Sequence, residues 1–88
     1  MNTNLINSVM QSRFENPEHK MLLAQMAFEA DEEGLCHAAI DSLADSCGLT
    51  LTKTFKSIEA LKESGCLDFQ GHHVNKVVFK LSESGWRS

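Results

Sequence analysis

Apolar residues recur with a helical period along the first third of the chain. Residues 4–13 carry one apolar stripe at i, i+4 spacing, which predicts a short helix. Asn16-Pro17-Glu18 is typical of a helix start, because Asn can cap, Pro suits the first helical position, and an acid suits the positive end of the helix dipole. The pattern therefore predicts a second helix from Pro17 to Ala30.

The helix expected over residues 17–30 is apolar on nearly every side. Gln25 and Glu29 form only a narrow polar line along it, and a helix of this kind is buried on most sides. In a chain of 88 residues, that burial requires the N-terminal helix, a second subunit or both. We therefore expect a homodimer that forms through residues 4–30. The residues assigned to this contact are Leu5, Ile6, Val9, Met10, Leu22 and Met26.

Two further helices are expected on either side of a tight turn. A polar break and a very short strand at Leu35-Cys36 precede a helix over residues 38–47. Gly48 suits the left-handed position just past a helix end, and Thr50 can cap a following helix over residues 51–64. The inward residues expected on these helices are Ile40, Leu43 and Ala44, and then Thr54, Ile58 and Leu61.

Period-two alternation replaces the helical period after Gly65. It predicts two strands joined by a loop over residues 71–75, hence a β-hairpin. The expected fold class is mainly α with a small antiparallel β-hairpin, an α+β fold, in one domain over residues 1–88. Its parts are an N-terminal helix (1–16), a helical core (17–65), the hairpin (66–81) and a tail (82–88). Trp86 in the tail either covers an open edge of the core or belongs to a dimer contact.

The charge distribution changes the meaning of the net charge of −4, which alone argues against a nucleic-acid binder. Residues 1–50 carry eight acidic and two basic side chains, a balance of −6. Residues 51–81 carry five lysines and three acids, a balance of +2. The positive charge therefore lies in the second helix of the pair and in the hairpin.

Residues 43–67 have the sequence LADSCGLTLTKTFKSIEALKESGCL. It resembles the Leu-Ala, Gly-Leu-Thr/Ser, Ile-x-x-Leu-x-x-x-Gly-x-Leu pattern of winged helix-turn-helix domains. It is most similar to small bacterial regulators and to the N-terminal domains of phage and plasmid replication initiators. The resemblance covers about residues 18–81 and implies a recognition helix over 51–64, a wing at 71–75, and double-stranded DNA as the partner.

The resemblance places Leu51, Thr52, Phe55, Lys56 and Glu59 toward the groove, where family members typically carry Arg, Lys, Gln, Ser or Asn. The apolar pair Leu51 and Phe55 could touch thymine methyls or an unstacked base, while lysines hold phosphates. It could instead bind a protein partner, or a rotation of the helix could bury Phe55 in the core. The residues assigned to DNA contact are Thr50, Leu51, Thr52, Lys53, Phe55, Lys56, His72, His73 and Lys76.

Other chemistry is not expected. The cysteines are odd in number and lack a Cys-x-x-Cys motif, which indicates free thiols in a reducing compartment. The possible ligands, including adjacent His72 and His73, lack the close paired spacing of a zinc site, and no catalytic motif is present, so we expect no metal, no cofactor and no enzyme. The apolar stretch MLLAQMAFEA is too short for a membrane span, and the N terminus lacks a secretion signal, so a cytoplasmic protein is expected.

The function expected from the sequence is DNA binding that depends on base sequence, by a small regulator of transcription or replication of phage or plasmid origin. A further regulatory or replication protein is considered as a partner. The alternative is a protein-interaction module, an inhibitor or adaptor, that keeps the fold without binding DNA.

Overall fold

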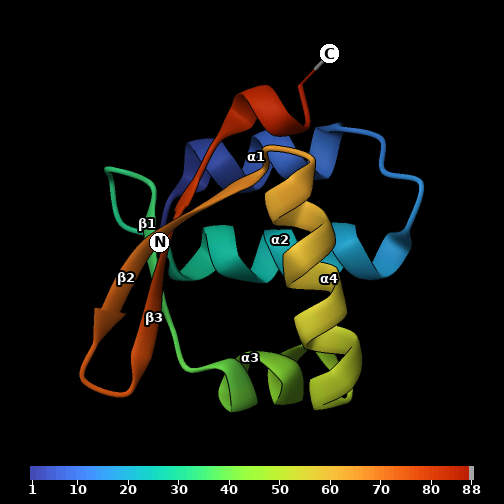
Figure 1. Ribbon diagram of the computed structural model, residues 1–88. Coiled ribbons are helices and arrows are strands. Elements are labelled where there is room, and N and C mark those ends of the chain that lie inside the picture. The colour runs from blue at the N-terminus through green and yellow to red at the C-terminus, as the bar shows by residue number, and fades with distance from the viewer. Residues whose placement is uncertain (88) are drawn as a thin grey trace.

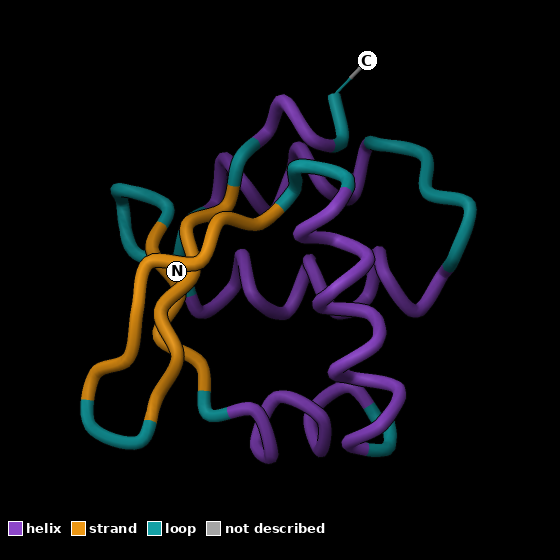
Figure 2. The backbone as a smooth tube through the Cα atoms, viewed as in Figure 1, coloured by secondary structure: helices purple, strands orange, loops and turns teal. Residues whose placement is uncertain are grey.

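The computed structural model describes residues 1–87, which form a mixed α+β structure with helices and an antiparallel sheet. Figure 1 shows α2 across the middle of the molecule, between α1 above it and α3 below it, with α4 toward the right and the strands toward the left. Figure 2 shows the same separation of helices from strands. The elements are α1 (Thr3–Gln11), α2 (Pro17–Glu29), β1 (Leu35–Ala38), α3 (Ile40–Cys47), α4 (Leu51–Glu63), β2 (Leu67–His73), β3 (Lys76–Leu81) and the short 3-10 helix η1 (Glu83–Gly85).

The helix ends follow the capping signals in the sequence. The Asn16 side chain accepts a hydrogen bond of 2.9 Å from the Glu18 backbone N–H, and Pro17 opens α2. Gly48 ends α3 with a φ of 67°, and the Thr50 hydroxyl accepts a bond of 3.1 Å from the Lys53 N–H at the start of α4. These predictions are confirmed, and α2 and α4 each end one residue earlier than expected.

The sheet contains three strands in the described residues, in the order β1-β3-β2, and all neighbours are antiparallel. Cys36 of β1 lies opposite Phe79, and Ala38 lies opposite Val77. The prediction that a helix starts at residue 38 is therefore wrong, because pairing with β3 holds residues 35–38 extended and α3 begins only at Ile40. The expected hairpin is correspondingly part of a larger sheet.

A β-bulge interrupts β2. The register shifts between Phe69, opposite Phe79, and Gly71, opposite Val78, so Gln70 is an extra residue. Gly71 has a φ of 139°, a conformation that favours glycine. The turn contains only Val74 and Asn75, since His73 still pairs with Lys76. The predicted loop over residues 71–75 is therefore too long, because the bulge lets the strands continue almost to the tip.

The core lies between the helices and one face of the sheet. Trp86 packs against this core from the tail, and its Nε1–H donates a hydrogen bond of 2.9 Å to the Ser8 hydroxyl. The Ser8 hydroxyl in turn donates to the Glu83 carboxylate at 2.9 Å. Of the two fates considered for Trp86, covering a core edge within one chain is the one observed. The largest fully buried side chains are Leu22, Leu23, Met26, Leu43, Val9, Thr54 and Cys36.

Candidate functional site

The inner face of α4 fixes how this helix is rotated. Thr54, Ile58 and Leu61 are buried as predicted, and the Thr54 hydroxyl donates a hydrogen bond of 2.9 Å to the Thr50 carbonyl. Leu51 and Phe55 consequently point outward, with 50% and 53% of their surfaces exposed. The interpretation that Phe55 belongs to the core is wrong, because the adjacent Thr54 occupies the core position.

Polar residues surround this apolar pair. Thr50, Thr52 and Lys56 are all exposed, and Lys56 makes no ion pair within residues 1–87. The Lys53 ammonium lies 3.7 Å from the Glu18 carboxylate of α2, but both side chains are well exposed, so the attraction is weak. The N-terminal half of α4 therefore presents apolar, hydroxyl and cationic groups together.

The hairpin places its predicted site residues on two different faces. Val77 and Phe79 of β3 face the helices, so Lys76 and Lys80 lie on the outer face. His72, opposite Val77, lies on the inner side, and its ring centroid is 5.5 Å from that of Phe69. His73, opposite Lys76, lies on the outer side. The two histidines therefore do not form one contact surface, as their adjacency in an extended strand already indicated.

The hairpin tip and the N-terminal end of α4 lie along the same side of the molecule, with α3 between them (Figure 1). The exposed side chains of α3 include Asp41 and Asp45. These carboxylates reduce the positive charge available on this side. The hairpin tip and the start of α4 thus lie on one side of the fold, with a helix that carries exposed carboxylates between them.

The predicted dimer residues fall into two groups. Leu5, Val9, Leu22 and Met26 are buried in the core of this single chain, so in this conformation a contact with a second chain has to use other side chains. The sequence did not separate the core side of these helices from the outer side, because α2 is apolar all round. The remaining two predicted residues, Ile6 and Met10, reach the surface.

An apolar groove of about 460 Å³ lies between α1 and α2. Met21 and Phe28 of α2 line it with 46% and 53% of their surfaces exposed, and neither was predicted as a site residue. The signal that could have found them is the apolar character of α2 on all sides. The full lining is Ile6, Met10, Pro17, Lys20, Met21, Ala24, Gln25 and Phe28.

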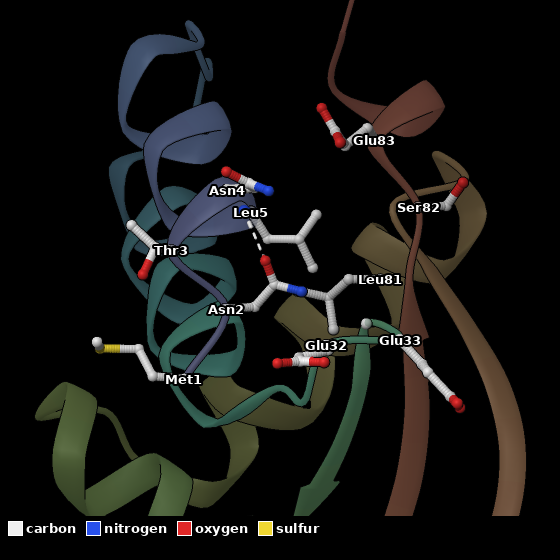
Figure 3. Close-up of a pocket in the computed structure, with 11 residues that line it drawn as sticks. Met1, Asn2, Thr3, Asn4, Leu5, Glu32, Glu33, Leu81, Ser82 and Glu83 are labelled. Carbon is white, nitrogen blue, oxygen red and sulfur yellow. Dashed lines mark hydrogen bonds between the residues drawn. The ribbon is translucent and has the colours of Figure 1, made fainter.

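A larger, polar hollow of about 710 Å³ lies beside the start of α1 (Figure 3). Asn2 in this hollow accepts a hydrogen bond from the Leu5 N–H at 3.0 Å and donates one to the Asp31 carbonyl at 2.8 Å. Glu83 is held by Ser8 and by Arg87, whose guanidinium lies 3.3 Å from its carboxylate. Asn2 and Glu83 are thus engaged in attaching α1 and the tail to the fold.

The cysteines are buried and unpaired with one another in the described chain. Burial, with a smaller contribution from the negative charge of Glu29, raises the pKa of the Cys36 thiol to about 12. Burial also raises the pKa of the Cys47 thiol. Such thiols stay protonated at neutral pH and are poor nucleophiles and poor metal ligands.

Within residues 1–87, no three His, Cys, Asp or Glu side chains are grouped in a way that could hold a metal ion. Over the same residues, no helix is long and apolar enough to cross a membrane. Comparisons with models of protein families, with curated proteins and with solved structures find no match to this chain.

Proposed function

We propose that this protein is a winged helix-turn-helix protein that binds double-stranded DNA through α4 and the hairpin, as a small regulator of transcription or replication. The order β1-α3-α4-β2-β3, the Gly48 turn between the two helices and the β1-β3-β2 sheet support this fold. The observation that carries the proposal is the rotation of α4. Its Thr54 side is held in the core, while Thr52, Phe55 and Lys56 face solvent.

The exposed half of α4 offers both kinds of contact that reading DNA requires. A helix of 13 residues is about 20 Å long and fits a major groove. In the proposed mode, Lys53 and Lys56 hold phosphates, Thr52 reaches a base edge, and Leu51 and Phe55 contact thymine methyls. Three lysines per chain, with Lys76 at the hairpin, neutralise few phosphates, so log K should fall with log salt with a slope of about −3 for each bound chain.

A homodimer belongs to this proposal, because two copies double the number of phosphate contacts. The contact we propose is the α1–α2 groove, through Ile6, Met10, Met21 and Phe28. Large apolar side chains exposed beside such a groove are typical of surfaces that a protein covers.

A second function is favoured by one observation. Leu51 and Phe55 lie one helical turn apart and are both about half exposed, close to an α3 that carries exposed carboxylates. An apolar pair on a side of the molecule that also carries carboxylates suits a protein partner with basic residues around an apolar centre better than it suits DNA. The chain would then act as an inhibitor or adaptor that keeps the fold.

The experiment that separates these functions measures binding of the purified protein to mixed genomic DNA fragments at low and near-physiological salt. Under the DNA proposal, Lys56→Ala lowers the affinity and reduces the salt slope by about 1, since one phosphate contact is lost. Lys62→Ala is the matched control, because Lys62 lies at the far end of α4 and pairs with Glu59 at 3.4 Å.

Each result of this experiment has a definite meaning. Retention of some fragments, with affinity that falls as salt rises, supports DNA binding and supplies candidate target sites. An absence of binding even at low salt rejects the DNA proposal. The protein-docking function then predicts that Phe55→Ala, and not Lys56→Ala, abolishes capture of a partner.

A further inference from the structure

The bulge in β2 determines which histidine lies beside His37 of β1. Phe69 still shares the inner face with Phe79, but the extra residue Gln70 shifts the alternation of side chains by one position. His73 therefore lies on the outer face of the sheet, where the exposed His37 also lies between two buried neighbours. The centroids of the two imidazole rings are 6.4 Å apart, and the rings are nearly perpendicular, at 87°.

The charged groups on this outer face come from all three strands. Lys76 lies directly opposite His73, and the uncharged Val78 lies opposite His37. Lys80, farther along β3, lies opposite Asp68, so its charge has a neighbour of opposite sign. In the described chain, His37, His73 and Lys76 take part in no ion pair. The pair of imidazoles thus has a permanent positive charge beside it and no carboxylate bound to it.

This arrangement suits an anion with several oxygen acceptors. Two imidazolium rings at this distance repel each other, and an anion between them removes the repulsion. Imidazolium N–H groups and an ammonium are donors to phosphate oxygens, and hydrogen bonds between charged partners are the stronger kind. The three groups are exposed, so a phosphate on a polymer can reach them without any change in the fold.

We propose that His37, His73 and Lys76 form a phosphate-binding site on the outer face of the sheet, which takes a backbone phosphate of DNA and strengthens as the pH falls below neutral. The DNA source of the phosphate rests on the function proposed above, whereas binding of phosphate itself does not. The site adds His37, which lies outside the predicted recognition helix and wing, to the contact surface.

The proposal predicts a DNA affinity that depends on pH. Lowering the pH from about 7.5 to about 5.5 favours the cationic form of histidine, which binds a phosphate more strongly than the neutral form does. We expect the affinity to rise about tenfold between these pH values, and the salt slope to steepen by up to about 2. Fluorescence anisotropy of a labelled duplex measures both quantities.

The decisive variant replaces both imidazoles with uncharged amides, His37→Gln and His73→Gln together. His19→Gln is the matched control, because His19 lies on α2, beside Leu61 and Trp86, and away from the sheet. A second arm uses inorganic phosphate and follows the imidazole resonances of the full chain by NMR near pH 6. This arm reports on the site without DNA.

A pH-dependent gain in DNA affinity in the wild type and His19→Gln that is lost in the double variant supports the proposal. If the double variant keeps the gain, the phosphate site is rejected while DNA binding stands. If the wild type binds no DNA at either pH, the proposed function fails and the phosphate arm decides. Shifts of the His37 and His73 resonances without a shift of His19 then support a site for free phosphate, and unchanged resonances reject it.

Discussion

The outer faces of α2 and α4 both expose large apolar side chains, yet their surroundings differ. On α2, Met21 and Phe28 border a groove whose lining carries a single charged side chain, Lys20, already bonded to two carbonyls at the end of α1. On α4, Leu51 and Phe55 stand among lysines and threonines. Exposed apolar area therefore does not define one function. The low charge around the α2 groove is the reason we propose a protein contact there, and the lysines around the α4 pair are the reason we propose a DNA contact there.

The largest expected effect is on the free energy of unfolding, and it comes from a buried residue of α2 compared with an exposed one. Leu22 is fully buried, so Leu22→Ala should lower the free energy of unfolding by about 3 kcal/mol through lost burial and a cavity. Met21→Ala, on the neighbouring but outer position, should cost less than about 1 kcal/mol. Urea unfolding at low protein concentration measures both. Equal losses would show that Met21 is as well packed in the single chain as Leu22.

The next test exchanges one exposed phenylalanine of each helix for serine, Phe28 of α2 and Phe55 of α4. Phe28→Ser should weaken the proposed dimer about 30-fold in Kd, the effect of losing one well-packed aromatic, and leave each α4 intact. Phe55→Ser should leave the dimer unchanged and weaken the contact made by α4. Sedimentation equilibrium gives the dimer constants. A wild type that stays monomeric at high concentration would remove the proposed contact at α2.

A third test concerns the thiol of Cys36, on β1, which packs against α2. Its pKa is raised from 9.0 to about 12, chiefly by burial, so between these values the unfolded chain loses a proton that the folded chain keeps. Stability should therefore fall as the pH rises above 9, by at most about 1.4 kcal/mol per pH unit from this group. Below pH 9 this group contributes no pH dependence.

Urea unfolding of the wild type and Cys36→Ala at pH 8 and pH 10 measures the alkaline effect. The difference in slope between the two proteins isolates Cys36 from Cys47 and from the lysines. Identical slopes would mean that the thiol ionises as easily in the folded chain as in the unfolded one.

The smallest effect on stability should come from removing the ion pair that joins α4 to α2. Lys53 and Glu18 are 3.7 Å apart, with 62% and 38% of their side chains exposed. Lys53→Ala should therefore change the free energy of unfolding by no more than about 0.5 kcal/mol. DNA affinity should fall in the same variant, and Glu18→Ala, which frees Lys53, should raise it. Opposite signs for these two variants would sharpen the contrast between α4 and α2.

Local signals predicted much of this fold. The caps at Asn16 and Thr50 and the glycine after α3 are signals carried by single residues, so the start of α2, the end of α3 and the start of α4 could be located to the residue. The start of α3 could not, because pairing of residues 35–38 with β3 depends on residues about forty positions away. The bulge at Gln70 could likewise not be predicted, since an alternating pattern of apolar and polar residues does not show where a strand contains an extra residue.

The candidate site was predicted less completely, for a reason visible in α2 and α4. Thr54 beside Phe55 decided the rotation of α4, although hydrophobicity alone favours burial of the phenylalanine. On α2, apolar residues occur on every side, so the sequence pattern does not show which side of the helix faces the core. Core residues such as Leu22 could therefore not be separated from surface residues such as Phe28. Predicting that His37 lies near His73 would have required the register of the sheet, which is known only from the folded structure.

The contacts of Ser8 have a consequence for the order of folding. This one hydroxyl joins α1 to Glu83 and Trp86, which lie 75 and 78 positions away in sequence. Bringing such distant segments together costs the most chain entropy, so these contacts close after the local turns and the hairpin. We therefore expect the contact between α1 and the C-terminal tail to form last during folding and to open first during unfolding, so that the amides of η1 should exchange hydrogen faster than those of the other helices.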